Sequence, residues 1–320
     1  MLFAGSLGLA ALLDYLIGDP WGWPHPVRFM GCLINYYVQA VLKHFKQPQA
    51  LRLAGGVLGV GLTTASGLAG WGLVHGATRF DPVAGLLLET VLLASCFAGR
   101  SLRAAAEDVL EPLSRGEIIT ARAQLGLYVG RDTESLSEPE ILRAVMETVA
   151  ENATDGVMAP LFYALLGAVL PGIGSLPLTL AYKAASTLDS MVGYRQKPYT
   201  HLGWFSARME DVLTWFPCRL TVLTIAILSA KPGLVWRTCR RDAIADPSPN
   251  AGWSECAYAA ALGIQLGGVN YYRGRRTIKP VLADPLYPIT PNRIRRAMQL
   301  TRSSFLLWLT LGIVSLSLAR

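Results

Sequence analysis

Charged residues are scarce in this 320-residue sequence, at 16% of the chain, against about 25% in an average soluble domain. This shortage favours a protein embedded in lipid over one with a large soluble core. The five cysteines are scattered and never form a Cys-x-x-Cys pair, which argues against a disulfide framework and a cysteine zinc site. Only four widely separated histidines are present, which argues against a histidine-rich metal site.

The familiar nucleotide-binding and hydrolase motifs are also missing. The sequence has no Gly-x-x-x-x-Gly-Lys-[Ser/Thr] loop, no Gly-x-Gly-x-x-Gly opening a helix after a strand, and no Gly-x-Ser-x-Gly elbow. ATP, if it is used, must bind in another way. A basic segment is lacking before the first apolar run, so we expect Leu2 to Ile17 to be retained and not to be a cleaved signal peptide.

Long stretches with almost no charge are what the sequence does have. They are the opening run and residues 53–77, 83–98, 157–182, 220–230 and 304–319. A membrane-spanning helix needs about 20 apolar residues. We therefore predict an all-α, polytopic membrane protein with about four to six membrane segments. Glycines recur in the second stretch in a way that suits close helix packing in lipid; they are Gly55, Gly56, Gly59, Gly61, Gly67 and Gly70.

The stretch from Val157 to Tyr182 is interrupted by Pro171, Gly172, Gly174 and Pro177. Each remaining apolar piece is shorter than a bilayer span. We therefore predict a broken helix or a re-entrant hairpin, because irregular backbone at membrane depth must be buried in protein or face a cavity.

Positive charge dominates, with a net charge of +7. Nucleic acid is not the expected partner, because the basic residues lie beside apolar segments without interleaved aromatic residues. Membrane lipid explains the charge better. Residues 231–302 hold twelve Lys and Arg against four acids, which predicts a cytoplasmic location. We predict one membrane domain, residues 1–320, with cytoplasmic insertions at about 99–156 and 231–303.

A helix is predicted over residues 138–155. Ser137 and Glu140 form a capping box at its start, and Gly156 supplies the stop. This helix lies in the first of the two predicted cytoplasmic insertions.

Three carboxylates recur along that helix at positions i, i+4 and i+8. Glu147, Glu151 and Asp155 would lie within about 80° of one another on one face. A solvated helix face is the ordinary explanation. However, like charges at this spacing repel, and Glu151 and Asp155 near the end of the helix oppose its dipole. The more specific hypothesis is therefore that this face binds a cation. Magnesium carrying a nucleotide fits, because Mg²⁺ takes one or two carboxylates together with phosphate oxygens.

Other polar clusters flank the apolar segments. His25 and Arg28 belong either to an interfacial loop or to an anion contact at the membrane surface. Lys183 either extends its ammonium group to the membrane–water interface or belongs to a functional site. Asn250 is predicted to cap a helix whose first N–H groups suit a phosphate, although a capped surface helix is the simpler explanation.

These clusters fall into blocks that run through nearly the whole chain. The blocks are Gly-Asp-Pro at 18–20, HPVRFMG at 25–31, GR at 99–100, VGRDT at 129–133, ETVAENATDGVMAPLFY at 147–163, KAASTLDSMVGY at 183–194, RMED at 208–211, PCRL at 217–220 and PSPNAGWSECAYAAALGIQLGG at 247–268. In amino-acid sequence and in order along the chain, these blocks resemble the CobD/CbiB family of adenosylcobinamide-phosphate synthases. Ser186, Glu210 and Cys218 depart from the Asn, Asp and Ala that are usual in that family.

The resemblance implies a multi-pass enzyme of the bacterial inner membrane whose site faces the cytoplasm. It implies an ATP-dependent ligase that attaches (R)-1-amino-2-propanol or its O-phosphate to adenosylcobyric acid. ATP and Mg²⁺ are then the expected cofactors, and other cobalamin-assembly enzymes are candidate partners.

Site roles are assigned within the matched blocks as hypotheses. We expect Glu147, Glu151 and Asp155 to hold Mg-ATP. The phosphate charge would be neutralised by Arg131 and Lys183, and Asp189 or Asp211 would assist deprotonation of the amine. The complete assignment is Lys183, Asp189 and Asp211 as catalytic residues, Arg131, Asp132, Asn152, Ser190 and Asn250 as cofactor-binding residues, and His25, Arg28, Arg100, Tyr194 and Arg208 as substrate-binding residues.

Two other classes of function stay open at this point. A transporter of a corrinoid or a small anionic solute would also use broken helices and charges near the membrane. Against it, most polar motifs lie in long segments predicted to be cytoplasmic, and no paired half-repeat is visible. A noncatalytic scaffold for corrin enzymes would leave the carboxylate stripe without a purpose.

Overall fold

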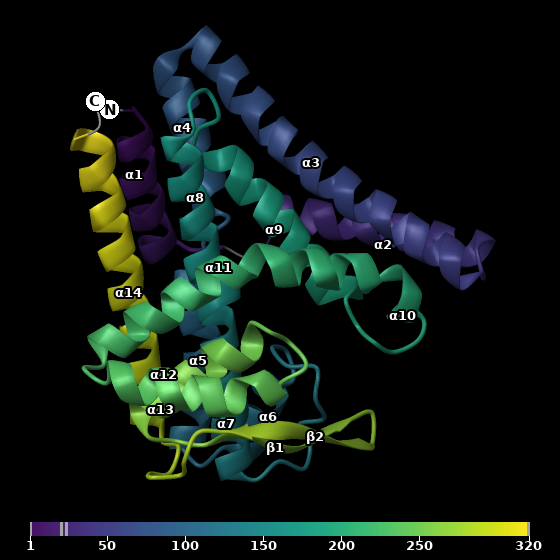
Figure 1. Cartoon of the computed structure of the whole chain (residues 1–320), viewed down its shortest axis with the longest axis vertical. Coiled ribbons are helices and arrows are strands. Elements are labelled where there is room, and N and C mark those ends of the chain that lie inside the picture. Colours follow the sequence, from purple (N-terminus) through teal and green to yellow (C-terminus); the bar gives the residue numbers. More distant parts are fainter. Residues whose placement is uncertain (1, 20–21, 23–24, 319–320) are drawn as a thin grey trace. The chain divides into compact units, whose positions relative to one another are not determined.

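The computed structural model describes residues 2–19, 22 and 25–318, and most of this part of the chain is helical (Figure 1). It divides into two compact units. Unit 1 comprises residues 1–98, 159–214 and 308–320, and unit 2 comprises residues 99–158 and 215–307. The predicted all-α class is confirmed. The prediction of one membrane domain with insertions at 99–156 and 231–303 stays a prediction.

Unit 1 consists of helices. They are α1 (Leu2–Leu16), α2 (Pro26–His44), α3 (Pro48–Phe80), α4 (Pro82–Ala94), α8 (Ala159–Val169), α9 (Ser175–Val192), α10 (Tyr199–Leu202), the first part of α11 (Trp204–Leu228) and the end of α14 (Pro291–Leu318). Three of these helices begin with proline, whose fixed φ and missing N–H suit a first helical position. Asp81 ends α3 and starts α4, because its carboxylate accepts the N–H groups of Val83 and Ala84.

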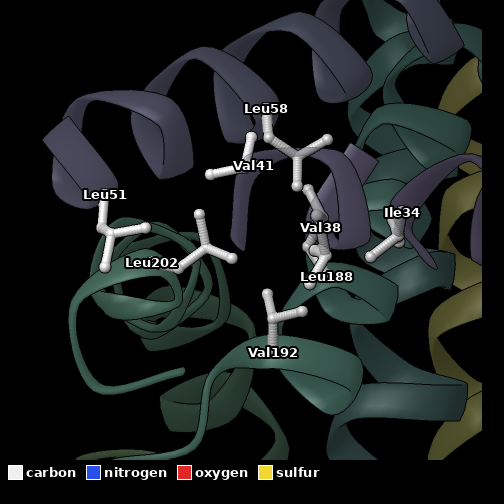
Figure 2. Packing of buried hydrophobic residues seen from close by; sticks show 8 residues of the cluster. All are labelled: Ile34, Val38, Val41, Leu51, Leu58, Leu188, Val192 and Leu202. Carbon is white, nitrogen blue, oxygen red and sulfur yellow. The ribbon is translucent and has the colours of Figure 1, made fainter. Parts of the chain in front are cut away.

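Aliphatic side chains from α2, α3, α9 and α10 pack together in unit 1 (Figure 2). The buried members are Ile34, Val38, Val41, Leu51, Leu58, Leu188, Val192 and Leu202. On α2 the first three recur at i, i+4 and i+7, the spacing of one helical face. This cluster fixes the C-terminal end of α9, which carries several of the predicted site residues.

Close approach of α3 to its neighbours requires some of its glycines. A Cβ atom on Gly55 would overlap the carbonyl oxygen of Leu202, and one on Gly70 would press on Leu180. Gly59 and Gly67 have similar close neighbours, whereas Gly61 faces open space. The predicted role of these glycines in helix packing is therefore confirmed at these four positions and wrong at Gly61, and a Cβ atom at Gly56 would make only an ordinary contact with Phe205.

The predicted break in the stretch 157–182 is confirmed. Helix α8 ends at Val169, helix α9 begins at Ser175, and the two helices pack against each other. Gly174 adopts φ +86°, and its carbonyl lies where a Cβ atom on Gly167 would be. At the start of α9 the buried Glu89 of α4 hydrogen-bonds the backbone of Ser175 and Leu176. Glu89 therefore satisfies N–H groups that the break leaves without a helical partner.

Four helical segments of the described residues are long and apolar enough to cross a membrane. They are Pro48–Phe80, Pro82–Ser114, Trp204–Leu228 and Pro291–Leu318, and Gly5–Leu16 is a shorter apolar helix. The predicted range of four to six segments includes this number. Exposed Leu53, Val57 and Leu68 on α3 suit contact with lipid tails.

Unit 2 combines helices with one β-hairpin. Its elements are α5 (Gly99–Ser114), α6 (Ile118–Leu125), α7 (Glu138–Asn152), the π-helical turn η1 (Ala153–Met158), the second part of α11, α12 (Pro232–Asp242), the 3₁₀ turn η2 (Ala243–Ala245), α13 (Ala251–Leu262), β1 (Leu266–Tyr272), β2 (Arg275–Leu282) and α14 as far as Leu307. The strands β1 and β2 pair antiparallel (Figure 1). The sequence analysis did not predict this hairpin.

A bulge near the start of β1 shapes the hairpin. The register shifts between Leu266 and Gly268, and Gly267 lies in the bulge with φ +84°. A Cβ atom at Gly267 would overlap the carbonyl oxygen of Pro280. Only glycine fits this conformation without strain. The bulge turns the Gly267 N–H toward α7, where it meets the candidate site.

Candidate functional site in unit 2

Helix α7 begins as the sequence predicts but continues differently. The Glu140 carboxylate accepts hydrogen bonds from the Ser137 N–H at 2.8 Å and from the Ser137 hydroxyl at 2.6 Å, which confirms the capping box. The predicted stop at Gly156 is wrong, because the chain passes through η1 into α8. A π-helical turn has more residues per turn than an α-helix, so it changes the angular position of Asp155 relative to Glu147 and Glu151.

Glu147 is buried and held by groups from three segments. The guanidinium of Arg131 pairs with its Oε2 atom, and Arg143 Nη1 lies 3.5 Å from Oε1. The Gly267 N–H donates to the same Oε1 at 3.0 Å. Arg131 also donates to Asn270 Oδ1 at 2.9 Å. The predicted phosphate contact of Arg131 stays a prediction, but its partners here belong to the protein itself.

Asp132, predicted to bind the cofactor, closes the tip of the hairpin. Its two carboxylate oxygens accept the N–H groups of Arg273 at 2.8 Å and Gly274 at 2.7 Å. Its own N–H donates to the carbonyl of Tyr271 at 2.8 Å. Arg131 and Asp132 therefore join the loop before α7 to β1 through adjacent positions.

A second group of charges surrounds Glu255, which is completely buried in α13. Lys279 of β2 donates to Glu255 Oε1 at 3.0 Å. Burial raises the pKa of Glu255 to about 8, against the opposing effect of Lys279. Burial works against the charge of Lys279, but Glu255, Glu151 and Glu147 outweigh it and raise the pKa of the lysine.

Glu151 acts electrostatically on both members of this pair. Burial raises the pKa of Glu151; Asp246 and Glu147 add to the effect, and Lys279 opposes it. Asp246 lies between η2 and α13, where its Oδ1 atom accepts the N–H of Ser248 at 2.9 Å. Four carboxylates from α7, α13 and the segment before α13 therefore share one region.

The described part of the chain contains no group of three His, Cys, Asp or Glu side chains spaced to hold a metal ion. Glu147 is already paired with two arginines, so the structure does not gather Glu147, Glu151 and Asp155 as ligands of one ion. The magnesium assignment stays a prediction.

Asn250 occupies the predicted N-cap position of α13, but its side chain does not cap the helix. Its Oδ1 atom accepts a hydrogen bond from Arg219 at 3.0 Å. The Arg219 guanidinium lies 4.6 Å from the ring centre of Trp253 and 5.0 Å from that of Trp215. Asn250 and Arg219 thus connect α13 with the second part of α11.

The other site residues predicted for unit 2 lie on its surface. Asn152 is exposed at the end of α7 and donates to the carbonyl of Thr148 at 2.9 Å. Arg100 is exposed in the first turn of α5. Their predicted roles stay predictions.

The remaining predicted residues belong to unit 1. His25 caps α2, and its ring nitrogens contact the Val27 N–H at 3.2 Å and Asp19 Oδ1 at 3.0 Å. Pro20, in the matched block at 18–20 that contains Asp19, lies outside the described residues. Arg28 is exposed in the first turn of α2. The anion contact predicted for His25 and Arg28 stays a prediction.

Helices α9 and α11 carry the others. Lys183, Asp189 and Ser190 lie on α9, and the Tyr194 hydroxyl donates to the Ser190 carbonyl at 2.8 Å. Within α11, Arg208 Nη1 lies 3.6 Å from Asp211 Oδ2. The roles predicted for these residues stay predictions.

The comparison with known proteins covers the chain almost from end to end. The family model described as CobD/Cbib protein matches residues 7–301. The chain belongs to the CobD/CbiB family. The cobalamin biosynthesis protein CobD of Synechocystis is 54% identical over 307 residues, which are 96% of this chain and 90% of that protein.

Two further CobD/CbiB relatives match over similar lengths. The cobalamin biosynthesis protein CbiB of Salmonella arizonae is 42% identical and covers 96% of this chain and 95% of its own length. The protein CobD of Geobacter metallireducens is 43% identical and covers 94% and 93%. No solved structure matches the chain.

Two of the three departures from the usual CobD/CbiB residues have defined surroundings. Glu210 is buried in unit 1, where its Oε1 atom accepts the Thr214 hydroxyl. Cys218 is buried in unit 2 and its thiol donates to the carbonyl of Asn250 at 3.3 Å.

Two members of the charged region, Glu255 and Asp246, were not predicted from the sequence. Glu255 is the one acidic residue in a run of small and apolar residues that forms α13, and Asp246 precedes a proline-rich turn. A lone acid in an apolar helix indicates a buried charged contact, because burying a carboxylate without a partner is costly.

Proposed function

We propose that this chain acts in cobalamin biosynthesis as an ATP-dependent ligase. Its reaction would join the amine of (R)-1-amino-2-propanol, or of its O-phosphate, to a carboxyl group of adenosylcobyric acid. The product is adenosylcobinamide or its phosphate. The observation that carries the proposal is the match to CobD/CbiB proteins over nearly the whole chain.

The chemistry demands an activated carboxyl group, because a carboxylate does not condense with an amine unaided. Transfer of the terminal phosphoryl group of ATP to a carboxylate oxygen releases ADP and leaves an acyl phosphate. The neutral amine then attacks the acyl carbon, phosphate leaves and the nitrogen loses a proton. The protein must position the reactants and balance charges that change at each step.

The charged region of unit 2 supports this proposal. Glu151 and Asp155 are suited to magnesium with nucleotide phosphates, since hard oxygen ligands in small number are what Mg²⁺ takes from a protein. The Arg131–Glu147 pair holds the loop before α7 against β1, so its role in the proposed reaction is to position the neighbouring groups. The region is proposed to face the cytoplasm at the inner membrane, where ATP is available.

The test is mass spectrometry of the products made by purified protein in detergent with ATP, magnesium and adenosylcobyric acid. (R)-1-amino-2-propanol and its O-phosphate are supplied in separate reactions. We expect an amide product together with ADP and phosphate, formed without a membrane gradient. Absence of product with both amines contradicts the proposal, and gradient-dependent uptake without ligation favours a transporter.

Two variants test whether Glu151 takes part in the proposed reaction. Glu151→Gln should abolish ligation while the protein still inserts in the membrane, because the change removes one charge at constant shape. Glu134→Gln is the matched control, since Glu134 is exposed in the loop before α7. Full activity in the Glu151 variant removes this carboxylate from the proposed mechanism.

A further inference from the structure

Unit 2 contains an acidic centre, which we define as Glu147, Glu151, Asp246 and Glu255. Glu147 faces Arg131 and Arg143, while Lys279 faces Glu255 and acts electrostatically on Glu151. Among the described residues these contacts and interactions set four acids against three cations. Burial opposes the charged forms of Glu151 and Glu255, so a further cation is needed to stabilise all four acids in their ionised form.

Two oxygens of the acidic centre are buried without a hydrogen bond within the described residues. Glu255 uses Oε1 for Lys279, and its Oε2 atom has no partner. Asp246 uses Oδ1 for the Ser248 N–H, and its Oδ2 atom has none. Buried polar atoms in native proteins are nearly always satisfied, and leaving one unsatisfied destabilises the fold. A positively charged hydrogen-bond donor would satisfy both oxygens of the acidic centre.

We propose that the acidic centre binds the ammonium group of the amine substrate, with Glu255 Oε2 and Asp246 Oδ2 as its acceptors. This inference rests on the proposed function and names where the aminopropanol is held. Glu151 adds negative charge next to both acceptors, since Asp246 and Glu255 each interact with it electrostatically.

Within the described residues the acidic centre offers no cage of three protein ligands for a metal ion, whereas an ammonium group needs no such cage. Magnesium requires its oxygen ligands at about 2.0–2.1 Å in near-octahedral geometry. Within the described ranges, no three acidic, histidine or cysteine side chains come close enough for that. Hydrogen bonds from nitrogen to oxygen are about 2.9 Å long, so an ammonium group reaches acceptors that stand farther apart.

Lys279 supplies an internal example of the proposed contact. Its ammonium nitrogen lies 3.0 Å from Glu255 Oε1, so this carboxylate already binds a primary ammonium group on one oxygen. The Lys279 side chain is 24% exposed and Glu151 is half-buried. The acidic centre therefore reaches the surface at these two residues, and the amine is proposed to enter beside them.

The experiment compares (R)-1-amino-2-propanol with 1,2-propanediol, which has a hydroxyl in place of the amine. The full chain in detergent is titrated with each compound at constant ionic strength, and the dissociation constant is taken from the shift in the unfolding midpoint. We expect the amine and not the diol to stabilise the wild type. Glu255→Gln and Asp246→Asn should each weaken amine binding about tenfold or more, because a charge-assisted hydrogen bond is lost.

Glu134→Gln is the control and should bind the amine like the wild type. Each variant keeps the oxygen used inside the protein, and the readout is the ligand-induced shift, so a change in basal stability does not obscure it. Equal effects of amine and diol, or unchanged amine binding in both variants, overturn the inference. A shift with magnesium chloride alone that depends on Glu255 and matches the amine shift also overturns it, in favour of a metal site.

Ligation assays on the same proteins separate this inference from the proposed function. Amine binding that depends on Glu255, without any ligation product in the wild type, contradicts the proposed function and leaves the ammonium site in place. Normal ligation with an unchanged KM for the amine in Glu255→Gln contradicts the ammonium site alone. The expected result is a rise in the KM for the amine with the KM for ATP unchanged.

Discussion

Arg131 and Glu147 form a buried ion pair that joins the loop before α7 to the middle of that helix. Their side chains are only 7% and 2% exposed. Arg131 reaches Asn270 of β1 as well, and Glu147 reaches the backbone of Gly267. Removal of either partner leaves a charge in a place that water does not reach.

Arg131→Met should destabilise the protein by about 3–5 kcal/mol, because it leaves Glu147 buried with only Arg143 as a cationic partner. Glu147→Gln combined with this change removes the uncompensated charge and keeps an acceptor for the Gly267 N–H. The double variant should therefore be more stable than the sum of the two single effects predicts. Denaturant unfolding of the purified variants in detergent measures this, and strict additivity contradicts the role of the pair.

Gly55→Ala should destabilise unit 1 by about 1–3 kcal/mol, since the new methyl group meets the Leu202 carbonyl. Gly61→Ala on the same helix is the matched variant. Nothing lies within 4 Å of a Cβ atom there, so it should stabilise α3 by up to about 1 kcal/mol through helix propensity. Thermal unfolding in detergent compares the two, and equal effects would show that α3 does not pack closely at Gly55.

Glu255 should make the protein less stable as the pH rises from about 4.5 to about 8. Its pKa in the folded state is raised to about 8 by burial, whereas an unfolded glutamate titrates near 4.3. Between these values the folded state binds more protons than the unfolded state, so the free energy of unfolding falls with increasing pH. The unfolding midpoint, measured across this range, should fall less steeply in Glu255→Gln, and an identical slope in both proteins contradicts the shift.

Local rules explain which parts of the fold the sequence predicts. The capping box at Ser137, the cap position of Asn250 and the break before Ser175 follow from neighbouring residues alone. The membrane segments follow from apolar length. The caps and the break depend on interactions between residues a few positions apart. The membrane segments depend on how apolar a whole stretch is. A single sequence is enough to recognise both.

The hairpin was missed although signals for it exist. Val269, Tyr271 and Tyr272 favour a strand, and Gly274 with φ +74° forms its turn. The apolar runs show no strand-like alternation, and this hairpin lies in a polar segment outside them. Its pairing with the loop before α7 joins residues about 140 positions apart, through Asp132 and the hairpin tip. No local rule predicts such a contact.

The candidate site was predicted in part for the same reason. Glu147 and Glu151 do share a region, because a regular helix places them one turn apart. Asp155 lies within the π-helical turn η1, which the spacing of apolar residues does not reveal. Glu255 and Asp246 join them from segments about 100 residues away, so only the folded chain brings the four acids together.

The divided sequence of unit 2 sets an order of events during synthesis. Glu147 is made 120 residues before Gly267, which supplies one of its hydrogen bonds. At about 5–20 residues per second, translation leaves a gap on the order of ten seconds between the two. During that interval α7 has been made but the β1–β2 hairpin has not, and residues 159–214 of unit 1 are already emerging. A nascent chain stopped before residue 267 therefore lacks both the Gly267 N–H that Glu147 accepts and Lys279, the partner of Glu255, whether or not its membrane helices have already inserted.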